Sequence, residues 1–170
     1  MVTTAMQQSN TKETISRFFE LCAKIEGVCA ELYHYYSGLH HDNEDVSRLW
    51  KKTAQEEENH QKQFELAYRL REDAGFELEF DLERAERIYQ KLIVLLAHVQ
   101  QNPPDIITAL TRAIEMEERL ADLHMENAVR FKDKSIKSLF QALSEFDQDH
   151  VKTLRHSLAV MTLSKSEMVG

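Results

Sequence analysis

The sequence contains few of the residues that end or interrupt helices. Its 170 residues include 4 glycines and 2 prolines, and the two prolines are adjacent, at Pro103 and Pro104. Glycine and proline are the least favourable residues inside a helix, so their scarcity indicates long helices joined by few turns. A chain of this length can form one ordinary domain with a sizeable core. We therefore expect a single domain over residues 1–170, with flexible tails at 1–10 and 164–170.

Long apolar runs and a secretory leader are missing as well. The longest apolar run, 92–97, is far shorter than the roughly 20 residues that span a bilayer, and residues 1–10 contain no apolar stretch typical of a signal peptide. The two cysteines, Cys22 and Cys29, are seven positions apart on one expected helix. That spacing is about 10.5 Å along the helix axis, which is too long for a disulfide. We therefore expect a cytoplasmic protein with reduced thiols and no membrane partner.

Positive charge is scarce relative to negative charge. The chain has 21 Lys and Arg residues against 29 Asp and Glu residues, which gives a net charge of −8. Affinity for nucleic acid comes mainly from basic residues that neutralise phosphates, so this balance disfavours a nucleic-acid partner. It is compatible with a protein that binds cations.

Apolar residues recur with helical periodicity in five segments. We expect four main helices at 12–39, 45–72, 105–131 and 135–163, and a fifth helix at 82–101 in the connection between the second and third of them. Asp45 is the expected N-cap of the second helix, and Gly75 is its expected stop. The predicted fold class is all-α.

A carboxylate–histidine step occurs once in each half of the chain. Glu57 precedes His60 by three residues, and Asp147 precedes His150 by three residues, 90 positions later. Each step follows a further carboxylate at nearly the same distance: Glu26 lies 31 residues before Glu57, and Glu117 lies 30 residues before Asp147.

These six polar residues fall on the apolar stripes of their predicted helices. Burying a carboxylate is costly unless it is paired or bound to a metal. Residues three apart on a helix share a face, so a carboxylate could bridge two metals while the following imidazole binds one of them. Hard oxygen donors combined with imidazole suit iron or manganese, and zinc is a further possibility. The simpler interpretation is that the six residues lie at the edges of wide stripes.

The surrounding residues also repeat between the two halves. With an offset of 90, the equivalent pairs are Trp50 and Phe140, Glu57 and Asp147, and His60 and His150. With an offset of 91, the equivalent pairs are Glu26 and Glu117, and Tyr33 and His124. The repetition favours a single dinuclear site to which both halves contribute.

At this level the chain resembles the ferritin-like superfamily, and most closely its rubrerythrin-like branch. The segments that carry the resemblance are 25–33, 49–60, 113–117 and 139–150. The resemblance implies a four-helix bundle with a long crossover that contains the additional helix. It also implies a di-iron site and redox chemistry with dioxygen or peroxide. By position, the family pattern assigns Glu26 and Glu117 as terminal ligands, Glu57 and Asp147 as bridging ligands, and His60 and His150 as the imidazole ligands.

The sequence departs from the family pattern in three respects. Asp147 stands where the family usually has glutamate, which is one methylene longer. His124 occupies the position equivalent to Tyr33, so it is either an extra ligand or proton donor, or a packed core histidine. Tyr33 and His124 are the candidate catalytic groups beside the metals. No Cys-x-x-Cys pair is present, so an electron donor would be a separate protein.

The sequence therefore favours a di-iron oxidoreductase that removes peroxide or oxidises iron, with two iron ions as cofactor. We expect a homodimer or a higher homo-oligomer. Three alternatives stay open: an iron storage or handling protein without turnover of an organic substrate, a bundle with a degenerate metal site, and a hydroxylase of an organic substrate.

Overall fold

The computed structural model describes residues 2–70, 82–131 and 133–167, and in these ranges it contains helices and no strand. The five helices are α1 (Val2–Leu39), α2 (Glu44–Leu70), α3 (Leu82–Gln101), α4 (Ile106–Ala128) and α5 (Lys134–Glu167). The all-α prediction is confirmed. None of the helices in these ranges is both long enough and apolar enough to cross a bilayer.

Short polar side chains fix where three of the helices begin. The caps are Asn43, Asp105 and Asp133, whose side-chain oxygens accept hydrogen bonds from the main-chain N–H groups three residues later. These bonds satisfy N–H groups that have no partner inside the helix. The prediction that Asp45 caps α2 is wrong, because Asn43 does so and Asp45 lies within the first turn.

Both terminal helices are longer than expected. Helix α1 begins at Val2 instead of near residue 12, and α5 continues to Glu167 instead of ending near residue 163. Helical periodicity in the apolar residues fades at these ends, so the sequence pattern underestimated them. Flexibility of the tails stays a prediction, because helical geometry does not measure motion. The expected stop at Gly75 lies outside the described residues.

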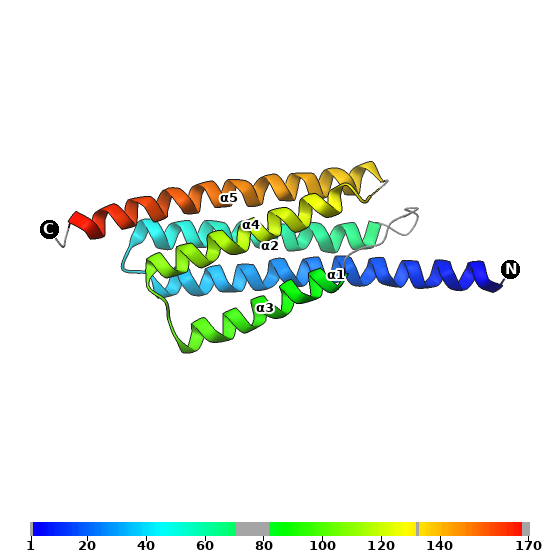
Figure 1. The fold of residues 1–170 in the computed structure, drawn as a ribbon, viewed down its shortest axis with the longest axis horizontal. Helices are drawn as coiled ribbons and strands as arrows, with labels where there is room; N and C mark the ends of the chain where they lie inside the picture. The colour runs from blue at the N-terminus through cyan, green and yellow to red at the C-terminus, as the bar shows by residue number, and fades with distance from the viewer. Residues whose placement is uncertain (1, 71–81, 132, 168–170) are drawn as a thin grey trace.

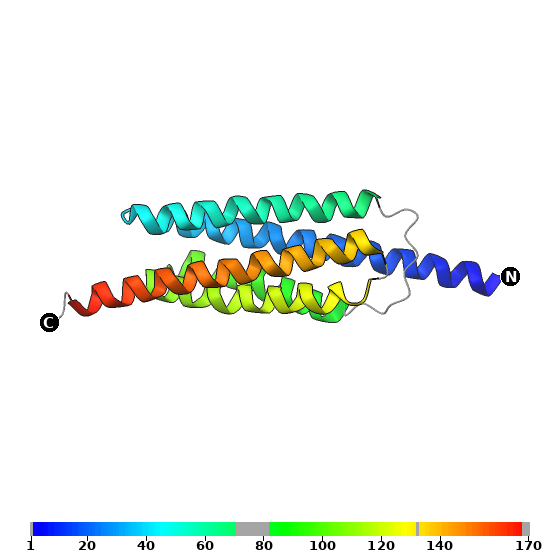
Figure 2. The same ribbon diagram turned by 90° about the horizontal axis from the view of Figure 1, so that it is seen from above.

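The helices are arranged as two antiparallel pairs with α3 at the side. Helix α1 lies beside α2, and α4 lies beside α5, in both views (Figures 1 and 2). Figure 1 shows α2 and α4 running in the same direction, and the two termini lie at opposite ends of the long axis. Helix α3 packs against α1, where the Tyr35 hydroxyl donates to the Val99 carbonyl at 2.9 Å.

Aromatic rings surround the helix segments that carry the predicted ligands. Along α2, Trp50 precedes Glu57 and stacks on Tyr33, with ring centroids 5.5 Å apart. Further along the same helix, Phe64 follows His60 and packs on Phe140 at 5.3 Å. The carboxylates and imidazoles of α2 therefore lie between two groups of packed rings, which join α2 to α1 on one side and to α5 on the other.

Candidate metal centre

All eight residues predicted for the site are buried, and they come from four different helices. None is more than 7% exposed. Their order along the chain is Glu26 and Tyr33 on α1, Glu57 and His60 on α2, Glu117 and His124 on α4, and Asp147 and His150 on α5. The i, i+3 spacing places both members of each carboxylate–histidine step on the inner face of their helix.

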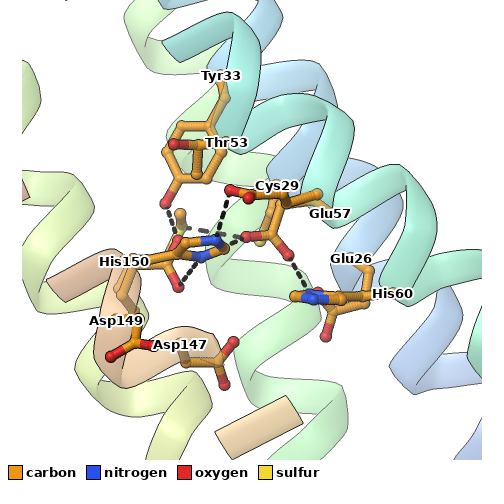
Figure 3. Close-up of polar contacts among 12 residues, drawn as sticks. Glu26, Cys29, Tyr33, Thr53, Glu57, His60, Asp147, Asp149 and His150 are labelled. Atoms are coloured by element: carbon orange, nitrogen blue, oxygen red, sulfur yellow. Dashed lines mark hydrogen bonds and ion pairs between the residues drawn. The ribbon is translucent and has the colours of Figure 1, made fainter. Parts of the chain in front are cut away.

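Glu57 lies at the centre of this set. Its Oε2 is 2.9 Å from Nδ1 of His60, and its Oε1 is 3.0 Å from Nδ1 of His150. Figure 3 shows the Glu57 carboxylate between the two imidazoles, one from α2 and one from α5. The two oxygens of one carboxylate thus face two different histidines.

Two groups of potential metal ligands share Glu57. One group is Glu26, Glu57 and His60, and the other is Glu57, Glu117 and His150. Within each group the ligand atoms all lie within 4.8 Å of one another. The structure therefore brings together five of the six predicted ligands in an arrangement in which one carboxylate belongs to both groups.

Asp147, the sixth predicted ligand, belongs to neither group. Its Oδ2 is 2.7 Å from Nδ1 of His124, and Nε2 of the same ring is 3.2 Å from Oε1 of Glu26. The imidazole of His124 thus lies between the two carboxylates. An aspartate reaches less far from its helix than a glutamate does, and here it reaches the neighbouring imidazole instead of the centre. Metal ligation by Asp147 stays a prediction of the family resemblance alone, because neither ligand group includes this residue.

The internal repeat of the sequence is also visible in the packing. Tyr33 donates a hydrogen bond to Glu117, a carboxylate of the opposite half. Its equivalent His124 contacts Glu26, the equivalent carboxylate of the other half. Trp50 packs on Tyr33, and its equivalent Phe140 packs on His124 with centroids 5.9 Å apart. Phe64 also packs on His124, at 5.6 Å.

One carboxylate in the site was missed by the sequence analysis. Oε2 of Glu56 lies 3.1 Å from Nε2 of His150, the ring nitrogen opposite the one that faces Glu57. Neighbouring residues on a helix point about 100° apart, so a pattern that selects Glu57 gives no reason to select Glu56. The contact exists because His150 reaches across from α5 to the edge of α2.

Burial and charge act strongly on the carboxyl groups. Burial, together with the charge of Glu117, raises the pKa of Glu57 to about 8. Burial also raises the pKa of Asp147 to about 6, although His124 opposes that rise. Burial would raise the pKa of Glu26 as well, but close polar contacts with His124 and His60 outweigh it and hold that pKa well below its usual value.

The three histidines are shifted toward the charged form. Burial lowers the pKa of an imidazole, but carboxylate partners raise it to about 10 for His60 and for His124. The pKa of His150 also rises well above its ordinary value, because hydrogen bonds to Glu117, Glu56 and Glu57 outweigh burial. Three imidazolium charges thus compensate the clustered carboxylates, and a metal cation that bound here would have to displace protons from the histidines that ligate it.

The phenol and the two thiols near the site stay neutral. Burial and the charge of Glu117 raise the pKa of Tyr33 well above its ordinary value. Burial and the charge of Glu26 do the same for the thiols of Cys22 and Cys29, both of which are free. Cys29 Sγ lies 4.0 Å from Met116 Sδ. Both cysteines therefore behave as small buried apolar residues.

Several buried oxygens of the site make no hydrogen bond of good geometry. They are both carboxylate oxygens of Glu26, Oε1 of Glu57 and Oδ1 of Asp147. A buried carboxylate oxygen without a hydrogen bond is costly. Such oxygens can coordinate a metal cation, which does not impose the angular requirements of a hydrogen bond. A ligand set of hard oxygens and imidazole suits iron or manganese.

Fold and site together define an all-α protein with a buried cluster of carboxylates and imidazoles. No protein-family model matches the sequence, and neither the curated proteins nor the solved structures compared with it give a significant match. The resemblance to ferritin-like proteins accordingly rests on the residue pattern alone.

Proposed function

We propose that the chain is a rubrerythrin-like member of the ferritin-like superfamily that binds two metal ions, with iron as the physiological metal. In this proposal α1, α2, α4 and α5 form the four-helix bundle, and α3 lies in the crossover between α2 and α4. Helices α2 and α4 run in the same direction, which supports this topology (Figure 1). Both halves can bring their ligands to one site only if these two helices are parallel. The five helices and the inward carboxylates fit the way such bundles hold metals.

The observation that carries the proposal is the position of Glu57. One carboxylate whose two oxygens face His60 and His150, and which belongs to two separate ligand groups, is suited to bridging two cations. Glu26 and His60 would complete one site, and Glu117 and His150 would complete the other. The buried carboxylate oxygens that make no hydrogen bond are available to coordinate a cation.

The bound iron would supply one-electron redox chemistry toward dioxygen or peroxide. The protein's own residues control protons and water around it. Tyr33 keeps its proton because of burial, and it presents that proton to Glu117. His124 holds a proton between Asp147 and Glu26. The packed rings of Trp50 and Phe140 exclude water behind these two groups.

The proposal includes a separate electron-donor protein, a cytoplasmic setting and a homo-oligomer. Peroxide removal and ferroxidase activity would both use this site. Steady turnover of peroxide with an external electron donor would favour the first. Iron oxidation followed by iron retention in a large closed oligomer would favour storage or handling.

Metal titration of purified protein tests the proposal. Wild-type protein should bind two Fe(II) ions per chain under anaerobic conditions, and the reduced form should be oxidised by peroxide or dioxygen in stopped-flow absorbance. Glu57→Gln should lose both metals, because it removes the charge that both sites share. The matched control is Glu58→Gln, which changes an exposed neighbour that pairs with His34. Equal metal content in Glu57→Gln and wild type would contradict the proposal.

A further inference from the structure

A groove between α3 and α4 concentrates positive charge. The cavity there has a volume of about 590 Å³. Five of the residues that line it are basic, against one carboxylate, Glu115; the basic residues are Arg84, Arg87, Lys91, Arg112 and Arg119. The chain as a whole carries a net charge of −8. The sign of the charge in this groove is therefore opposite to that of the protein.

Three of these cations have no acidic partner in the part of the chain that the structure describes. Arg84 pairs with Glu126 and Arg87 pairs with Glu83. No comparable pair involves the other three, which are Lys91, Arg112 and Arg119. Cations that share a groove repel one another. A cluster of three unpaired cations therefore indicates a binding site for an anion, which would lower this repulsion.

Among these cations, Arg112 gives the strongest indication of an anion-binding site. Its Nη1 is buried and makes no hydrogen bond. A buried guanidinium nitrogen without a partner is costly, because it has lost water and gained nothing in exchange. The fork of an arginine matches the oxygens of a carboxylate or phosphate, so a guanidinium that turned toward an anion in the groove would give this nitrogen a partner.

The rest of the groove lining is apolar. Four side chains form this part of the lining: Ile88, Leu92, Leu95 and Met116. From Arg84 to Leu95, α3 extends the groove over about 16 Å, long enough for a short alkyl chain beside a charged head group. A ligand pocket that combines apolar lining with a few polar anchors is typical of small-molecule sites, and the volume lies within their usual range.

We propose that the groove between α3 and α4 binds a small amphipathic anion, an alkyl phosphate monoester, whose phosphate pairs with Arg112 and whose chain lies on Leu92 and Leu95. Three unpaired cations exceed the single charge of a carboxylate, and a phosphate monoester carries about −1.5 to −2 at neutral pH. The groove cations lie outside the two ligand groups around Glu57. The same binding is therefore expected whether or not that site holds metal.

Calorimetric titration with decyl phosphate, below the concentration at which it forms micelles, tests the proposal. Wild-type protein should bind one molecule per chain, and rising salt should weaken the binding. Decanol and inorganic phosphate should each bind at least about tenfold more weakly, because each offers only half of the interaction. Affinity for decanol equal to that for decyl phosphate would overturn the role of the cations.

Arg112→Met keeps an apolar stem in place of the arginine stem and removes the charged guanidinium. It should weaken binding of decyl phosphate by about tenfold or more. The control Arg48→Gln removes an exposed arginine on α2 and should leave affinity unchanged. Should Arg112→Met fail to fold, Lys91→Gln combined with Arg119→Gln replaces it, since both side chains are exposed. Unchanged affinity in the folded variant would overturn the proposal.

A second copy of the chain could cover the groove instead. Sedimentation across a range of protein concentrations separates the two occupants. If Arg112→Met disrupts the dimer and decyl phosphate does not, the groove is a subunit interface, and this result would overturn the proposal. Dissociation of such dimers by decyl phosphate would support it.

Discussion

The two halves of the molecule offer equivalent residues to one site but use them differently. In the first half, Glu26, Glu57 and His60 form a complete ligand group without help from α4 or α5. In the second half, Glu117 and His150 complete a group only with Glu57 from the first half. The second half's own equivalent of Glu57 is Asp147, which pairs with His124 instead. Asp147 is shorter than Glu57 by one methylene group, and its carboxylate lies beside the centre of the site instead of at it.

The partners of the equivalent carboxylates Glu26 and Glu117 also differ between the two halves. The first half supplies a neutral phenol, Tyr33, to Glu117, whereas the second half supplies an imidazole, His124, to Glu26. A phenol contributes one hydrogen bond, but a charged imidazole needs carboxylates on both sides. Asp147 meets that need. The change from tyrosine to histidine and the change from glutamate to aspartate therefore compensate each other.

The largest effect should come from separating that compensating pair. His124→Leu leaves Asp147 buried without its cation and should lower the free energy of unfolding by about 3–5 kcal/mol. Adding Asp147→Leu should recover most of the loss, because Glu26, the other carboxylate that faces His124, keeps its contact with His60. Urea unfolding with a chelator present measures both variants.

The equivalent change in the first half provides the matched comparison. Tyr33→Phe removes a hydrogen bond from a group that is already neutral and should lower the free energy of unfolding by about 1 kcal/mol, or somewhat more because the acceptor is a carboxylate. Similar losses for Tyr33→Phe and His124→Leu, or a double variant as unstable as His124→Leu alone, would show that the two halves do not differ in this respect.

The next test compares the metal content of two carboxylate variants. Glu26→Ala removes a member of the first ligand group and should lower metal content from two ions per chain to one. Asp147→Ala removes a carboxylate that faces His124 and should leave two. Elemental analysis after gel filtration measures both variants, with circular dichroism as the control for folding. Loss of a metal in Asp147→Ala would show that Asp147 moves to the centre when metal binds.

The sequence predicted which helix faces would meet, but not every contact between them. Spacing along one helix is set by the backbone, so the i, i+3 steps placed Glu57, His60 and His150 correctly on inner faces. Contacts between helices depend on side-chain reach, which periodicity does not contain. For that reason the pairing of Asp147 with His124 and the contact of Glu56 with His150 emerged only in three dimensions.

The stability of metal-free protein should fall as pH rises, and both halves should contribute. His60 and His124 have pKa values raised to about 10, so their stabilising charge is complete below the unfolded value of about 6.5 and is lost as pH rises through about 10. The raised pKa of Glu57, about 8, acts in the same direction. Melting temperatures measured with a chelator between neutral pH and pH 10 should therefore decrease.

Metal should reverse this trend, because it binds deprotonated histidine and its affinity rises with pH. The variant His124→Leu/Asp147→Leu should retain the part of the decrease that His60 contributes. A profile flat between neutral pH and pH 10 in metal-free wild type would contradict the assignment of charged imidazoles to both halves.

The smallest effect is expected at the outer edge of the second ligand group. Glu56 faces one ring nitrogen of His150 while the other ring nitrogen faces Glu57 and Glu117. A carboxylate in that position orients a ligating imidazole and increases its basicity. The corresponding ring in the first half, His60, has the half-exposed Phe146 beside it, with centroids 5.4 Å apart. Glu56→Gln should therefore weaken one of the two metals by about tenfold and leave the other unchanged, as measured by competition with a chelating dye. Equal weakening of both metals would indicate that Glu56 acts through the net charge of the site and not through His150.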